Sequence, residues 1–149
     1  MSKITLSQFA DRLSEIMPLM LKEFAKRQLK ELYKDNITLP QYLILEFIHR
    51  EGELKMTTLA NSMEVTTAAM TGIIDRLVRD GYVARNFDPQ DRRVIKVKLT
   101  RKADNLVKRI NQQKRQMVIK IFGKISESDR QDYLRIVTQI KDMLIKENA

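Results

Sequence analysis

The feature that most constrains this chain is a change of hydrophobic period within the segment Thr57–Thr100. Before Gly81, apolar residues recur at intervals of three and four positions, which is the spacing of one face of an α-helix. Gly81 itself fits the position just past a helix end, where a left-handed backbone is needed. After it, Val94–Leu99 alternates apolar and lysine residues, which is typical of a half-buried β-strand. The segment therefore predicts two helices followed by a β-hairpin.

The two helices are predicted to form a helix-turn-helix. The first is predicted over Thr58–Met63, with Thr57 as its N-cap, because a threonine hydroxyl can accept a hydrogen bond from a free helical N–H. Glu64 and Val65 form the turn, and Thr66 caps the second helix in the same way. The predicted buried face of this second helix consists of Met70, Ile73, Ile74, Leu77 and Val78.

The hairpin is predicted to pair Val94–Leu99 with Tyr82–Phe87. Asp88–Asp91 connects them with turn chemistry, because proline fixes φ and an aspartate can accept a bond from its own backbone. Arg92 and Arg93 then stand at the tip. A helix-turn-helix followed by a basic hairpin is a winged helix, and this arrangement predicts DNA binding.

The same residues resemble the MarR family of bacterial transcription regulators. The wing signature of that family, D-x-R-x(5)-L-T, is matched by Asp91-Arg92-Arg93 and, five residues later, Leu99-Thr100. Leu59-Ala60 in the first helix and Ile74-Asp75-Arg76-Leu77 in the second also match, as does Gly81. The resemblance implies a mainly α fold with a small β-hairpin wing, an α+β arrangement that acts on double-stranded DNA as a homodimer.

The chain departs from the family pattern at two positions. Gly72 stands where many members carry an arginine on the recognition helix, so the base contact of that arginine is not carried over. A helical glycine is then either a cost of up to ~1 kcal/mol in helix propensity or a site of close backbone approach. Ala103 replaces the glycine that usually follows the wing.

Composition narrows the classes of function. The chain has 28 Lys and Arg against 19 Asp and Glu, a formal net charge of +9 that favours a polyanionic partner. The segment 85–102 alone holds seven basic and two acidic residues. The absence of cysteine excludes disulfides, thiolate metal sites and regulation by cysteine oxidation. No apolar run approaches the ~20 residues of a membrane span, and Asp11 and Glu15 interrupt a signal-peptide pattern, so a cytoplasmic protein is expected.

Amphipathic helices are predicted before the winged segment. Leu6–Lys34 keeps one apolar stripe on both sides of Pro18, so we expect a single kinked helix. Thr38 and Gln41 have the spacing of a capping box and begin the next helix, which Glu51-Gly52 ends.

Two more helices are predicted after the wing. Thr100 caps a helix that runs to about Phe122, and Ser126 caps a last helix whose apolar stripe includes Tyr133 and Leu144. The outer face of the former is basic, which fits a solvated surface or an added attraction to DNA phosphate.

These terminal helices are more apolar than one small lobe can cover, and monomers rarely leave such faces exposed. We therefore expect a two-fold homodimer. Its helical dimerisation region comprises residues 1–36 and 101–149, and residues 37–100 form the winged DNA-binding lobe.

The helix Thr66–Arg79 is predicted to enter the major groove, where base edges distinguish all four base pairs. Thr71 is expected to read bases, Arg76 to contact phosphate, and Asp75 to position Arg76 or a wing residue. At the tip, Arg93, with Arg92 as a second candidate, is expected in the minor groove. Asp91 and Arg93 could instead pair to shape the turn, or both could hold, with Arg92 left free for DNA. The predicted DNA-binding residues are Thr57, Thr66, Thr67, Ala68, Ala69, Thr71, Gly72, Asp75, Arg76, Asp91, Arg92 and Arg93.

The family resemblance also implies release from DNA by a small aromatic anion bound between the lobe and the dimer helices. Candidate lining residues are Phe24, Tyr42, Phe47 and His49, all of which fit a structural core equally well. His49, the only histidine, stands in the last turn of its helix, where the helix dipole favours it. No metal or other cofactor is expected.

Three classes of function remain to be compared. An enzyme is not expected, because the chain has four glycines with no phosphate-binding loop and no supported catalytic group. A winged-helix module for protein or RNA contacts and a basic amphipathic protein at a membrane surface remain alternatives. The arginine-tipped hairpin favours a sequence-specific DNA-binding regulator, and a repressor in particular, on a near-palindromic operator.

Overall fold

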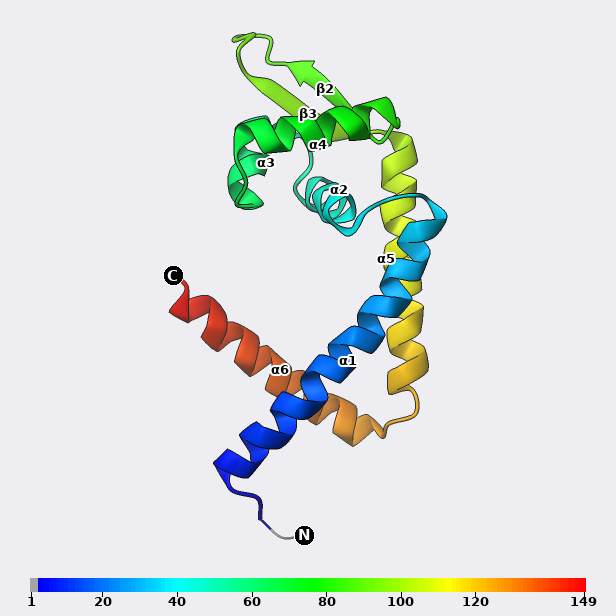
Figure 1. The fold of residues 1–149 in the computed structure, drawn as a ribbon, viewed down its shortest axis with the longest axis vertical. Coiled ribbons are helices and arrows are strands. Elements are labelled where there is room, and N and C mark those ends of the chain that lie inside the picture. Colours follow the sequence, from blue (N-terminus) through cyan, green and yellow to red (C-terminus); the bar gives the residue numbers. More distant parts are fainter. Residues whose placement is uncertain (1–2) are drawn as a thin grey trace. The chain divides into compact units, whose positions relative to one another are not determined.

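The computed structural model describes residues 3–149, which form six helices and a three-stranded antiparallel sheet (Figure 1). It confirms the mainly α fold with a small hairpin wing. The chain divides into two compact units, Met1–Ile110 and Asn111–Ala149. In chain order the elements are α1 (Leu6–Lys34), α2 (Leu39–Glu51), β1 (Leu54–Lys55), α3 (Met56–Ser62), α4 (Thr67–Arg79), β2 (Val83–Phe87), β3 (Ile95–Leu99), α5 (Arg101–Phe122) and α6 (Glu127–Glu147).

Side-chain caps fix where most of these helices begin. The predicted capping box of Thr38 and Gln41 is present, as is one formed by Thr5 and Gln8 at the start of α1. Thr66 accepts a hydrogen bond from the N–H of Ala69, and Ser126 caps α6 in the same way. Each such cap satisfies an N–H group that has no partner inside the helix.

The prediction for the first helix of the helix-turn-helix was wrong at its N-terminus. Helix α3 begins at Met56, so Thr57 lies inside it, and the N-cap position is Lys55, which makes no side-chain cap. The reason is that β1 ends at Lys55 and the chain enters α3 directly, which buries Met56 in the core.

The helix ends that border the winged segment use left-handed residues. Asn36, Glu64 and Gly81 follow α1, α3 and α4 with positive φ angles. After α4, the N–H of Tyr82 bonds the Leu77 carbonyl at 2.8 Å and that of Gly81 bonds Val78 at 3.1 Å. This paired arrangement is the Schellman motif, and it turns the chain sharply from α4 into β2.

The sheet has the strand order β1-β3-β2. The predicted pairing of the two hairpin segments is present, with Val83 opposite Leu99 and Phe87 opposite Ile95. The third strand, β1, was not predicted. It pairs Leu54 with Val97 on the other edge of β3 and so attaches the wing to the start of α3.

One buried hydrophobic cluster holds the first unit together. Met70, Ile74 and Leu77 of α4 are fully buried in it, while Ile73 and Val78 are partly buried at its edge. Helix α2 contributes Ile44 besides Tyr42, Leu45 and Ile48. Leu32 of α1 and four residues of α5, namely Ala103, Leu106, Val107 and Ile110, also belong to the cluster.

Thr100 joins the wing to α5. Its hydroxyl donates to the Gly81 carbonyl at 2.6 Å and accepts from the N–H of Ala103 at 3.3 Å. Its own N–H bonds the Tyr82 carbonyl at 3.1 Å. Lys102 adds to this junction, because its ammonium lies 4.3 Å from the centre of the Tyr82 ring and donates to the Asp80 carbonyl.

In the second unit, α6 follows the last part of α5 after a short turn. Arg130 donates to the carbonyls of Phe122 and Ile125 and so ties α6 to that turn. Phe122 and Tyr133 pack with ring centres 5.3 Å apart. None of the residues of α6 is buried, although the helix carries many large apolar side chains.

Within residues 3–149, no helix combines the length and the apolar character needed to span a lipid bilayer. No group of three or more histidine or carboxylate side chains in that range is arranged to hold a metal ion.

Candidate nucleic-acid interface

Helix α4 presents a face of small residues to solvent. Thr66, Thr67, Ala68, Ala69 and Gly72 are exposed, and Thr71 is half-buried. This face is possible because Met70, Ile74 and Leu77 occupy the opposite side and anchor the helix in the core. Small side chains let a helix approach a surface closely. This face of α4 is therefore suited to lying within a groove of a partner.

Two residues of this face have defined surroundings. The Thr71 hydroxyl donates to the Thr67 carbonyl at 2.8 Å, so its proton is committed within the helix. Its methyl group and its remaining lone pair stay available. At Gly72, a Cβ atom would meet no other atom within 4 Å, so the glycine is not required by packing inside the lobe.

Helix α4 and the wing are joined by an ion pair. Arg85 of β2 donates to the carboxylate of Asp75. Of the two roles expected for Asp75, positioning Arg76 or a wing residue, the structure therefore supports the second. Arg76 is exposed on α4.

The wing tip is shaped by two aspartates. Asp91 accepts from the side chain of Arg93 at 3.1 and 3.2 Å and from the Arg93 N–H at 3.0 Å. Asp88 accepts from the N–H of Gln90 at 2.8 Å and pairs with Lys96 at 3.3 Å. The side chain of Arg93, then its backbone, lowers the pKa of Asp91, and the Gln90 N–H followed by Lys96 lowers that of Asp88.

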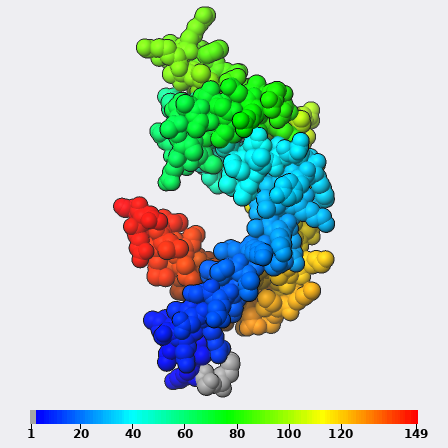
Figure 2. Space-filling model, viewed as in Figure 1, coloured from blue at the N-terminus to red at the C-terminus, as the bar shows by residue number. Residues whose placement is uncertain are grey.

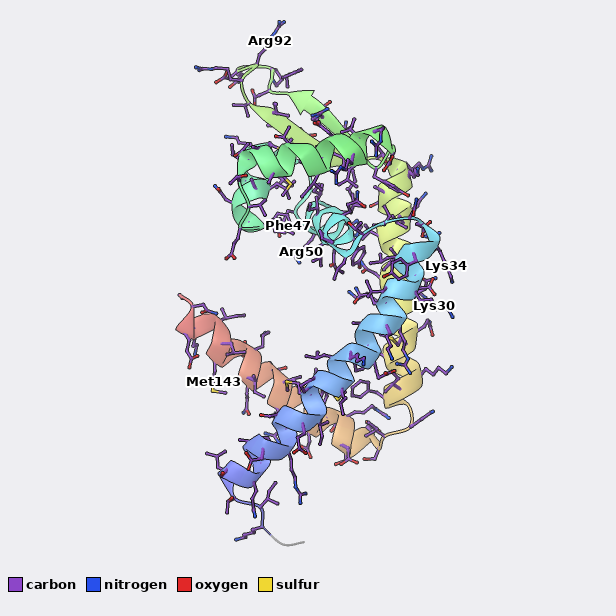
Figure 3. All side chains as sticks on the ribbon, in the orientation of Figure 1. Lys30, Lys34, Phe47, Arg50, Arg92 and Met143 are labelled. Carbon is purple, nitrogen blue, oxygen red and sulfur yellow. The ribbon has the colours of Figure 1, made fainter. Side chains whose placement is uncertain are left out.

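Arg92 differs from Arg93 in having no ion pair within the described residues. Figure 3 shows its side chain at the end of the hairpin, pointing away from the lobe. The space-filling view shows the same tip standing clear of the other elements (Figure 2). Because Asp91 pairs with Arg93, the guanidinium of Arg92 is left without an ion pair among the described residues of the tip.

The comparisons with known proteins agree on one family. The family model described as "MarR family" matches residues 37–95, which contain α2 to α4, β1, β2 and the start of β3. A solved MarR family protein from Bacillus stearothermophilus superposes with a TM-score of 0.84, covering 95% of this chain and 99% of that one at 20% identity. Residues 37–95 thus form a MarR-family domain.

Among the curated relatives of this chain is the HTH-type transcriptional repressor MdtR of Bacillus subtilis, 35% identical over 99 residues and 64% of each chain. The match spans 48% to 64% of the length of the first curated relatives. A mutant of MepR from S. aureus, solved bound to an oligodeoxyribonucleotide, has a TM-score of 0.69 at 20% identity. It covers 88% of this chain and 96% of that one.

The four candidate effector residues differ in their burial and in their contacts. Tyr42 is fully buried, and burial followed by the charge of Glu46 raises its pKa to about 12. Phe47 lies five positions further along α2, on a different face, and the Arg50 guanidinium covers its ring at 5.3 Å. His49 bonds Asp104 of α5 at 2.9 Å. Phe24 is half-buried on α1.

Sequence reasoning did not single out Arg85 or Asp104. Arg85 pairs with Asp75, ten residues earlier, and Asp104 pairs with His49, 55 residues earlier. Neither spacing carries a local signal, although the alternation of β2 could have placed Arg85 on the side that faces α4. Asp104 also pairs with Lys108 at 2.7 Å, which together with His49 lowers the Asp104 pKa.

Proposed function

We propose that this MarR-family protein is a sequence-specific, double-stranded DNA-binding transcription regulator that acts as a homodimer. In this proposal α4 lies in the major groove and reads bases through Thr67 and Thr71. The wing lies over the adjacent minor groove, with Arg92 as its main phosphate or groove contact.

The observation that carries this proposal is the combination of two features in one lobe. The first is the small, exposed face of α4. The second is the wing tip, whose aspartates are both paired so that Arg92 is the cation left for a partner. The Asp75–Arg85 ion pair links α4 to the wing that carries the second feature. The oligonucleotide complex of the MepR mutant supports DNA as the partner.

The dimer is supported by the apolar side chains that the chain leaves exposed. On α6, Leu134 is 66% exposed and Ile145 is 60% exposed. On α1, Leu6 and Leu19 are 83% and 65% exposed. Apolar faces of this extent mark protein interfaces, and a second copy of the chain is the partner we propose. Two copies would place their α4 helices on half-sites ~10 bp apart in a near-palindromic operator.

We infer repression rather than activation, which the name of the relative MdtR supports. We also propose that a small aromatic anion, if it regulates the protein, binds the released conformation more tightly than the DNA-bound one. Its site would involve the surroundings of Phe24, Phe47 and His49, whereas the fully buried Tyr42 would need the core to open.

The test is selection of bound duplexes from a random pool, followed by affinity measurements on the selected duplex over a series of salt concentrations. Arg92→Ala should weaken binding, and it should reduce the slope of log K against log salt by about 1, because one phosphate contact is lost. Arg12→Ala on α1 removes the same charge away from the proposed interface and should leave the slope unchanged.

Three outcomes would contradict the proposal. The first is failure of the parent protein to enrich any duplex. The second is equal or tighter binding to RNA, which would favour the RNA-binding alternative. The third is flotation with anionic vesicles in place of duplex binding, which would favour the membrane-surface alternative.

A further inference from the structure

The end of β2 carries an aromatic side chain that the lobe does not cover. Phe87 is 67% exposed. Together with Asp88, Pro89 and Arg92 it lines an open hollow of about 470 Å³ at the wing. Single exposed apolar residues are common on proteins, so the position and the neighbours of Phe87 decide what it does.

Strand alternation places Phe87 on the side of the wing that faces α4. Successive side chains of a strand point to opposite faces, so Val83, Arg85 and Phe87 of β2 share one face. Val83 is buried in the core, and Arg85 bonds Asp75 of α4. Phe87 comes next along the same face, opposite Ile95. Its ring is largely exposed, so the rest of the lobe does not cover it.

The charges around the hollow favour a surface that alternates apolar and anionic groups. Asp88 is paired with Lys96 and Asp91 with Arg93, so neither carboxylate is an unpaired negative charge. What the hollow offers is a phenyl ring, a proline ring and the unpaired guanidinium of Arg92. A DNA strand presents the C–H faces of deoxyribose between successive phosphates, which matches these groups in kind and in order.

We propose that Phe87, with Pro89, packs against a deoxyribose of the strand that separates the major groove occupied by α4 from the minor groove under the wing tip, while Arg92 binds the neighbouring phosphate. This inference rests on the proposed function and extends it. The contact is apolar and independent of sequence, so it adds affinity that salt does not screen.

The matched variants are Phe87→Thr and Phe87→Leu. Threonine keeps the strand preference of a β-branched residue but removes the ring, and leucine restores part of the apolar surface. Because Phe87 is largely exposed, both variants should keep the thermal stability of the parent, which a melting curve checks. Arg92→Ala serves as the electrostatic comparison.

With the selected duplex, Phe87→Thr should raise Kd by about fivefold to tenfold, as expected for losing part of the burial of an aromatic ring. The slope of log K against log salt should stay at the parent value, whereas Arg92→Ala should lower it by about 1. Phe87→Leu should recover part of the affinity. The loss should be similar on selected and on unrelated duplexes.

Hydroxyl-radical footprinting at saturating protein gives the direct readout, because it reports the accessibility of individual deoxyriboses. The parent and Arg92→Ala should protect sugars beside the minor groove that Phe87→Thr leaves open to cleavage. Equal affinity and an equal footprint of parent and Phe87→Thr would overturn this inference and leave the proposed function standing. A loss confined to one base sequence would also overturn it, and a parent that binds no duplex would overturn both.

Discussion

At the scale of single residues, the exposed face of α4 includes a position without a side chain, Gly72. Gly72 has no packing reason to be a glycine, since a Cβ there would lie in open space. Its φ is not in the left-handed region either, so the backbone conformation does not demand it. Neither packing within the lobe nor backbone conformation therefore requires glycine at position 72.

We therefore expect Gly72→Ala to stabilise the lobe. Alanine in a helix interior is favoured over glycine by about 1 kcal/mol through backbone entropy, and no clash offsets this gain. Urea unfolding of the parent and the variant measures the difference, and a variant less stable than the parent would contradict the prediction. If the DNA-binding proposal holds, the stabilised variant should also bind the selected duplex more weakly.

The sequence predicted the identity of the wing-tip residues but not how they divide their roles. Spacing alone left open whether Arg93 binds DNA or pairs with Asp91. That choice depends on the turn geometry, which brings the Arg93 side chain and N–H to one carboxylate. The bond between His49 and Asp104 could not be predicted from the sequence either, because it joins two helices that only the packed core brings together.

At the scale of elements, the wing tip depends on two ionised carboxylates. The pKa values of Asp88 and Asp91 are lowered in the fold from their ordinary value of 3.8. A group whose pKa is lower in the folded state stabilises that state at pH values above the unfolded pKa. The stabilisation is lost as the pH falls through the folded pKa.

The order of the wing tip should therefore be constant above about pH 4 and should be lost only in more acidic solution. The amide signals of Gln90 and Arg93 in a pH titration by NMR report it, because each N–H donates to one of the carboxylates. Asp91→Asn should shift the Arg93 signal already at neutral pH. A transition of the parent near pH 6 would contradict the prediction.

The elements with strong local signals were predicted well. The bounds of α1 agree with the prediction, as do the capping box that starts α2, the cap of α4 and the hairpin. Strand β1 was missed because two residues cannot show an alternating pattern, and its pairing with β3 is a tertiary contact. The error at Thr57 followed from this omission, since the unseen strand moves the start of α3 to Met56.

At the scale of the whole molecule, the division into a lobe and a dimerisation region remains a prediction. The core of the lobe also draws on α1 through Leu32 and on α5 as far as Ile110, so the winged segment is not self-sufficient. The exposed apolar side chains of α1 and α6 are the surface that a second copy would bury.

We expect the parent protein to sediment at twice the chain mass of 17.5 kDa. Ile140→Asp on the apolar stripe of α6 should produce monomers, because a buried unpaired carboxylate is costly. It should also weaken binding to the selected duplex at least about tenfold, since two half-sites are no longer bound together. Gln139→Asp adds the same charge off the stripe and should remain dimeric. A monomeric parent, or a dimeric Ile140→Asp variant, would contradict the prediction.

The bonding of Thr100 has a consequence for how the wing can move. The same residue closes the hairpin through Tyr82 and Gly81 and begins α5 through Ala103. A slip of β3 along β2 by one residue would break both the bond of the Thr100 hydroxyl to the Gly81 carbonyl and the bond of its N–H to the Tyr82 carbonyl. The residue that begins α5 thus also opposes any change of register at the base of the hairpin.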